Sequence, residues 1–148
     1  MAIEGDYEPG AWEWVNQQVQ AYEAAGGQEA NTLQGTTMPI IVITTRGHRS
    51  GKVRKFALMR VEHDGEYALV ASKGGMPADP AWVHNLRADP QAVILQDGPE
   101  PFAVTVRELE GEERERWWQR SVAAYPGNTA ARFVHDILRV RISARMSR

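Results

Sequence analysis

Residues 38–72 read MPIIVITTRGHRSGKVRKFALMRVEHDGEYALVAS, and they set the expected architecture of this chain. The run from Met38 to Thr44 is short, apolar and β-branched, which is typical of a buried strand. A glycine-containing turn follows, and residues 53–63 form a second candidate strand. Asp64-Gly65 is a strong two-residue hairpin signal, and residues 66–72 pair back behind it. Three strands joined by short turns predict an antiparallel sheet.

The rest of the 148-residue chain adds strands and helices around this unit. Helices are expected at Pro9–Ala25, residues 79–88 and Gly111–Ala124, with a short one at 128–135, and further strands at 91–96, 101–109 and 136–144. The fold class is therefore α+β, one domain spanning residues 1–148. Residues 1–37 supply an N-terminal helix and loop, and residues 38–148 supply about six antiparallel strands, with inserted helices, that could close into a small barrel. No G-x-G-x-x-G motif follows a strand, which argues against a Rossmann fold.

Composition excludes several classes of function. The formal net charge of -2 argues against a general nucleic-acid binder. There is no cysteine, and the four histidines show no metal-ligand spacing, so neither a disulfide nor a metal site is expected. No apolar run is long enough for a membrane span, and residues 1–10 lack the features of a signal peptide. We therefore expect a cytoplasmic protein.

The segment Arg46–Lys55, RGHRSGKVRK, is here called the basic turn. Five of its ten residues are Lys or Arg, and no acid occurs between Ala30 and Val61. Gly47 and Gly51 would let the backbone approach a ligand and offer N–H donors. Arginine side chains bind phosphate oxygens in pairs. The turn could hold a phosphate or several carboxylates, although a solvated basic hairpin and a nucleic-acid patch are alternatives.

A second candidate site is the loop Ser72-Lys73-Gly74-Gly75, which follows the third strand. It combines a hydroxyl, an ammonium group and two permissive glycines, and so could cradle a polar heterocycle. Trp82 and Asn85, at i and i+3 on the following helix, are expected on one face of that helix. The alternative is a tight loop whose glycines only turn the chain.

These stretches together resemble the deazaflavin (coenzyme F420)-dependent nitroreductase family of the flavin/deazaflavin split β-barrel superfamily. The matching segments are TTRGHRSGKVRK (44–55), ASKGG (71–75), DPAWVHNL (79–86) and ADP (88–90), with EERERWWQRSVAAYP (112–126) further on. Three spaced motifs in one order are more specific than any one of them. The resemblance covers most of the chain beyond its first thirty or so residues, and it implies a split β-barrel.

The resemblance also implies site residues for coenzyme F420. The phosphate and oligoglutamate tail would lie on the basic turn, at Arg46, His48, Arg49, Ser50, Gly51, Arg54 and Lys55. Ala57 and Leu58 would border the deazaflavin ring, Ser72, Lys73, Gly74 and Gly75 would contact the ring and its ribityl arm, and Pro80, Trp82 and Asn85 would close the site. The substrate would meet Trp12, Trp14, Met76 and Tyr125.

The implied activity is hydride transfer from the reduced deazaflavin to an enone or unsaturated ester, a quinone or a nitroaromatic compound. Lys73 would stabilise negative charge, and Tyr125 would donate the proton, with water as the competing donor. Two alternatives stay open: a split-barrel enzyme that uses FMN, and a non-catalytic protein that binds the coenzyme, haem or a fatty acid. The sequence leaves the oligomeric state open.

Overall fold

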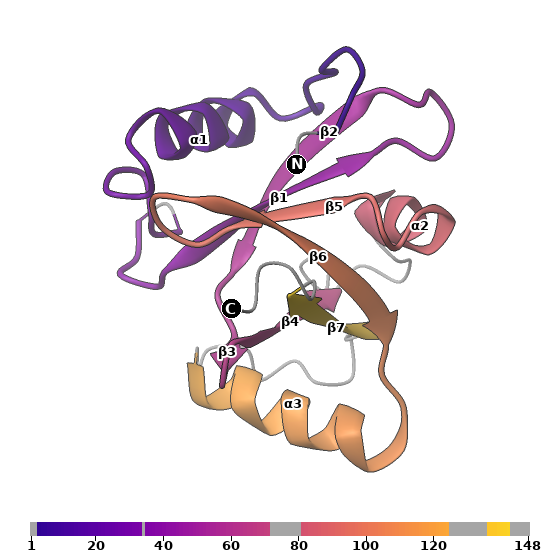
Figure 1. The fold of residues 1–148 in the computed structure, drawn as a ribbon. Helices are drawn as coiled ribbons and strands as arrows, with labels where there is room; N and C mark the ends of the chain where they lie inside the picture. The colour runs from indigo at the N-terminus through magenta and orange to yellow at the C-terminus, as the bar shows by residue number, and fades with distance from the viewer. Residues whose placement is uncertain (1–2, 34, 72–80, 125–135, 143–148) are drawn as a thin grey trace.

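The computed structural model describes residues 3–33, 35–71, 81–124 and 136–142 (Figure 1). These ranges contain α1 (Glu13–Ala24), β1 (Ile40–Arg46), β2 (Val53–Met59), β3 (Glu62–His63), β4 (Glu66–Ala71), α2 (Ala81–Ala88), β5 (Val93–Gln96), β6 (Pro101–Glu108), α3 (Gly111–Ala124) and β7 (Asp136–Ile142). The predicted α+β class with an antiparallel sheet is confirmed.

The strands form one sheet in the order β2-β1-β5-β6-β7-β4-β3, and every pairing in it is antiparallel. The last strand, β7, lies inside the sheet between β6 and β4. We predicted about six strands, and the described residues contain seven. The difference arises because the strand predicted at 53–63 is interrupted at Arg60 and Val61, where the chain leaves one edge of the sheet.

This interruption determines the shape of the sheet. β2 and β3 are its two edge strands, yet only Arg60 and Val61 separate them in the chain. The Arg60 N–H donates to the Pro39 carbonyl at 3.0 Å, and the Ala68 N–H donates to the Val61 carbonyl at 2.9 Å. The three Cα–Cα steps from Met59 to Glu62 can span only about 10 Å. The sheet must therefore curl until its two edges are neighbours.

α1, α2 and α3 cover separate parts of the sheet (Figure 1). α1 packs Val19 and Tyr22 onto the outer side of β1, at Ile40 and Val42. α3 buries Trp117 in a second cluster. α2 covers the main core, whose buried members are Ile41, Ile43, Tyr67, Leu69, Leu86, Val93, Leu95, Val104 and Val106. The inner face of the curled sheet is thus the main core, and α2 lies at one end of it.

The N-terminal region differs most from its prediction. We expected a helix from Pro9, but α1 begins at Glu13, with Trp12 as an extended N-cap residue. Residues 3–10, called the N-terminal segment, instead lie beside β2. The Val53 N–H donates to the Asp6 carbonyl at 2.8 Å, and the Glu8 N–H donates to the Val53 carbonyl at 2.9 Å. Pairing with an exposed strand edge satisfies backbone groups that a longer helix would have left to water.

The hairpin prediction at Asp64-Gly65 is confirmed. Both residues have positive φ, 53° and 81°, as the tight turn between β3 and β4 requires. The helix predicted at Gly111–Ala124 is observed with those bounds, and the other predicted boundaries within the described residues differ from the structure by at most two residues. The short helix predicted at 128–135 lies outside the described residues.

Candidate functional site

The basic turn joins β1 to β2 at the open end of that hairpin. The Gly47 N–H donates to the Lys52 carbonyl at 2.7 Å, and the Gly51 N–H donates to the Gly47 carbonyl at 3.0 Å. Gly51 has a φ of 72°, and a Cβ on Gly47 would lie 2.9 Å from the Ser50 hydroxyl oxygen. The glycines therefore allow a tight backbone turn between β1 and β2.

α2 holds this turn through Asn85. The buried Asn85 Oδ1 accepts hydrogen bonds from the His48 N–H at 3.0 Å and from His48 Nδ1 at 2.6 Å. A backbone N–H can only donate, so the atom of Asn85 that faces it is the oxygen, and His48 Nδ1 must carry a proton. The His84 ring lies 5.8 Å from the His48 ring. Asn85 thus fixes both the start of the turn and the orientation of an exposed histidine.

Trp82, one helical turn before Asn85, stacks on Phe56 of β2. Their ring centroids are 5.1 Å apart, and their planes differ by 16°. The prediction that Trp82 and Asn85 share one face of the helix is confirmed, because both side chains point toward the β1–β2 hairpin. The face of α2 that meets the hairpin therefore combines a flat apolar wall with a polar anchor.

Ala57 and Leu58 were both predicted to border a ring. In the structure Leu58 packs with the main core, whereas Ala57 packs with the cluster under α1. Successive residues of a strand point to opposite faces. The two side chains therefore cannot contact the same side of one ligand, and one of them would contribute only backbone.

The cations of the basic turn meet acidic partners that sequence reasoning did not identify. Arg54 Nη1 lies 3.1 Å from Glu8 Oε1, and Lys55 Nζ lies 2.7 Å from Glu23 Oε2. Lys55 also lies over the Tyr7 ring, 5.7 Å from its centroid. Burial raises the pKa of Tyr7, and the negative charge of Glu23 acts in the same direction. The distribution of charge in the sequence was a signal for these ion pairs, because residues 31–60 contain no acid whereas residues 4–23 contain several.

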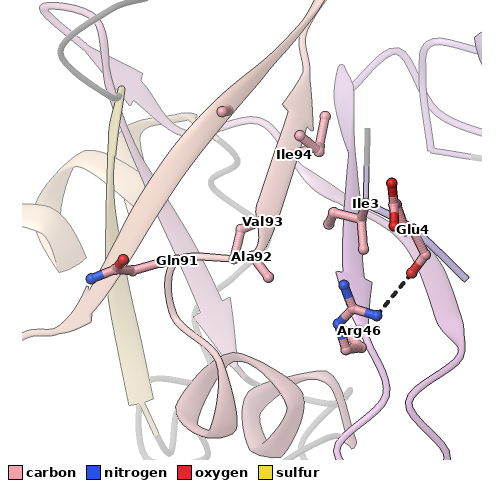
Figure 2. A pocket seen from close by; sticks show the side chains of 8 residues that line it. Ile3, Glu4, Arg46, Gln91, Ala92, Val93 and Ile94 are labelled. Carbon is pink, nitrogen blue, oxygen red and sulfur yellow. Dashed lines mark hydrogen bonds between the residues drawn. The ribbon is translucent and has the colours of Figure 1, made fainter. Parts of the chain in front are cut away.

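A cavity of about 400 Å³ opens beside the first cation of the turn (Figure 2). It is lined by Ile3, Glu4, Arg46, Gln91, Ala92, Val93, Ile94 and Ala103. Arg46 Nη1 donates to the Glu4 carbonyl at 2.8 Å, the interaction drawn as a dashed line in Figure 2. Of these residues, only Arg46 belongs to a motif that predicted a site, since the others carry no motif.

Trp12 and Trp14 form an exposed aromatic pair at the start of α1. Their rings stack with centroids 6.2 Å apart, and the two residues are 68% and 45% exposed. Packing does not account for such exposure of two large aromatic residues. They remain candidates for contact with a ligand.

The other predicted site residues lie outside the described residues: Ser72, Lys73, Gly74, Gly75, Met76, Pro80 and Tyr125. Among the residues that the structure does describe, no group of three or more His, Asp or Glu side chains is placed to bind a metal. In the same part of the chain, no helix is both long and apolar enough to cross a membrane.

Comparisons with known proteins identify the family of this chain. The model of the F420H(2)-dependent quinone reductase family matches residues 14–144. The chain belongs to this family. Among its relatives, an F420H(2)-dependent quinone reductase of Mycobacterium tuberculosis is 32% identical over 100 residues, which are 66% of this chain. The match also spans 66%, just under two thirds, of that relative's length.

Two solved structures are similar as well. One, described as an F420-H2 dependent reductase (FDR-A), is 46% identical with a TM-score of 0.63, over 70% of this chain and 94% of that one. Another, described as a domain-swapped dimer, is 40% identical with a TM-score of 0.65, over 87% of this chain and 98% of that one. The family resemblance noted in the sequence is thus confirmed.

Proposed function

We propose that this chain is a reductase that uses reduced coenzyme F420 to transfer a hydride to a quinone. Membership of the F420H(2)-dependent quinone reductase family is the observation that carries this proposal. The family and the similar F420-H2 dependent reductase favour the deazaflavin over FMN. Among the acceptors considered from the sequence, the name of the family favours a quinone over an enone or a nitroaromatic compound.

The donor set of the basic turn suits the anionic arm of this coenzyme. Arg46, Arg49, Lys52, Arg54 and Lys55 lie on one short hairpin, whereas the Gly47 and Gly51 N–H groups already donate to carbonyls of the turn itself. The hairpin would bind the phosphate and the oligoglutamate tail through charge-assisted hydrogen bonds. His48, Ser50 and Gly51 complete the set that we propose for this arm.

Next to this arm, Phe56 and Trp82 supply an apolar wall on which a flat ring system can be positioned. We propose that the Leu58 side chain, the Ala57 backbone, Ser72, Gly74, Gly75 and Pro80 complete the ring site, with Asn85 acting on it through His48. Trp12, Trp14 and Met76 would hold the acceptor. These side chains orient two flat molecules against each other and exclude water between them.

When bound, the reduced deazaflavin supplies a hydride, because carbon replaces the reactive nitrogen of a flavin. A quinone that receives a hydride has gained two electrons and one proton, so it needs one further proton to become a hydroquinone. We propose that Tyr125 donates this proton, and that the Lys73 ammonium stabilises the negative charge that precedes its transfer. Unchanged turnover in Tyr125→Phe would remove that residue from the mechanism.

The test is a fluorescence titration of the purified protein with oxidised F420, FMN and FAD at low and high salt. Binding of F420 that is selective and weakened by salt is expected, followed by turnover of F420H2 with a soluble quinone. Binding of FMN without F420 would refute the proposal in favour of a flavin enzyme. Binding of F420 without turnover on any acceptor would favour a carrier protein.

We further propose that the curled sheet is a split β-barrel within a single domain of residues 1–148. The short link at Arg60 and Val61 between the two edge strands supports this shape. A single cooperative unfolding transition, seen alike by tryptophan fluorescence and by circular dichroism, is expected for one domain. Two separate transitions would contradict it.

A further inference from the structure

The acidic partners of the basic turn come from outside it and are held in place by the fold. The Glu8 carboxylate accepts from Arg54 at 3.1 Å and from the Ser50 hydroxyl at 3.4 Å. The two Glu23 oxygens accept from Lys55 at 2.9 and 2.7 Å. Glu8 is positioned by its backbone pairing with Val53 and Glu23 by α1, so the location of each acid is set by backbone structure and not by its ion pair alone.

The remaining cations of the turn are not neutralised by carboxylates. The Arg46 guanidinium donates to the carbonyl oxygens of Glu4 and Gly51, which carry no formal charge. Arg49 and Lys52 have no ion-pair partner among the residues that the structure describes. Three of the five positive charges of the turn are therefore uncompensated there, and two are already paired.

We infer that Glu8 and Glu23 are specificity-determining residues that limit how many negative charges the basic turn accepts from a ligand. Each carboxylate forms an ion pair with a cation that a further phosphate or carboxylate of the ligand would otherwise bind. Additional negative charges on the ligand must therefore displace Glu8 from Arg54 or Glu23 from Lys55. This inference rests on the proposed function, because it concerns the anionic arm of the same coenzyme. A short arm is served by the uncompensated cations alone, whereas a long oligoglutamate arm competes with the two internal carboxylates.

The burial of the two pairs is consistent with such competition. The side chains of Arg54 and Glu8 are 35% and 40% exposed, and those of Lys55 and Glu23 are 26% and 29% exposed. Ion pairs this accessible to water are weak enough to exchange for another anion. Because the backbone holds Glu8 and Glu23 close to Arg54 and Lys55, each carboxylate has a high effective concentration there. It therefore competes with the anionic groups of a ligand for these cations.

The test compares the unsubstituted protein with the double variant Glu8→Gln/Glu23→Gln, which keeps both shapes and removes both charges. Three probes are titrated by fluorescence at low and high salt: the deazaflavin without phosphate or glutamates, short-tailed F420 and long-tailed F420. We expect the affinity for long-tailed F420 to rise about two- to fivefold per carboxylate removed. Its salt dependence should steepen, and the affinity for the tailless deazaflavin should not change.

Glu29→Gln is the matched control. It makes the same charge change near the end of α1, and the described residues show no contact between Glu29 and the turn. Thermal unfolding checks that each variant is folded, and the single variants Glu8→Gln and Glu23→Gln replace the double variant if it is not. An unchanged affinity and salt dependence for long-tailed F420, or an equal gain for the tailless probe, overturns the inference and leaves the proposed function standing. Failure of the unsubstituted protein to bind any form of F420 overturns the proposed function, and this inference with it.

Discussion

Replacing Asn85 by alanine is expected to release the basic turn from α2. The Asn85 side chain is buried, and its Oδ1 accepts two hydrogen bonds from His48, at 3.0 and 2.6 Å. Each bond contributes about 1 kcal/mol net, and in the variant water can replace part of the bond to the exposed His48 ring. The free energy of unfolding should therefore fall by roughly 1–3 kcal/mol. At about 3 °C per kcal/mol for a chain of this size, the Tm should fall by roughly 3–9 °C.

The contribution of the ring can be separated from that of the backbone by a double-mutant cycle. His48→Ala removes only the bond from Nδ1, and the His48 N–H still donates to Asn85. Urea denaturation of the two single variants and the double variant should give a coupling energy of about 1 kcal/mol. The same samples should show weaker F420 binding for Asn85→Ala, because the turn loses its anchor.

Two results would refute this reasoning. An additive cycle, within about 0.3 kcal/mol, would show that the bond from the ring contributes nothing to stability. A free energy of unfolding for Asn85→Ala within about 0.5 kcal/mol of the unsubstituted protein would show that α2 does not hold the turn through Asn85.

Three further predictions follow from other parts of the structure. Gly27 has a φ of 81°, and a Cβ there would lie 2.7 Å from the Gly98 Cα, so Gly27→Ala should lower the free energy of unfolding by about 2–5 kcal/mol, measured in urea. Burial raises the pKa of Tyr67, and its hydrogen bond to Asp97 acts in the same direction. The neutral Tyr67 side chain therefore contributes stability below the ordinary pKa near 10, and this contribution is lost as the pH rises above that value. The free energy of unfolding, measured against pH, should decline at alkaline pH in the unsubstituted protein, and this decline should be absent in Tyr67→Phe. Trp12 is 68% exposed, so Trp12→Ala should change stability by less than about 0.5 kcal/mol, while steady-state kinetics should show a higher KM for the quinone and an unchanged Kd for F420 if Trp12 contacts the acceptor.

The sequence was informative wherever a local rule decides the structure. The Asp64-Gly65 turn needs two residues with positive φ, and the sequence supplies the residue types that adopt it. The shared face of Trp82 and Asn85 follows from helical spacing alone. The strand predicted at 53–63 contains no glycine or proline to mark its interruption. Its break at Arg60 and Val61 lies where the chain passes from one edge strand of the sheet to the other, which is not a local property.

The acidic partners of the basic turn were missed for a similar reason. Arg54 and Glu8 are 46 residues apart in the chain, and Lys55 and Glu23 are 32 apart. No periodicity links residues at such separations. The imbalance of charge was visible, because residues 4–29 contain acids and residues 31–60 contain none. Only the fold brings the partners together: backbone pairing with Val53 places Glu8, and α1 places Glu23.

That pairing gives the N-terminal segment two effects at once. β2 is an edge strand, and the segment covers part of its exposed backbone near Val53. The same contact places Glu8 on Arg54 and so lowers the charge that the turn presents. Loss of the pairing should therefore lower stability and raise the affinity for anions together, because one set of contacts produces both. A basic turn that was only a solvated hairpin would lose stability without any gain in affinity for anions, since no ligand would compete with Glu8 for its cations.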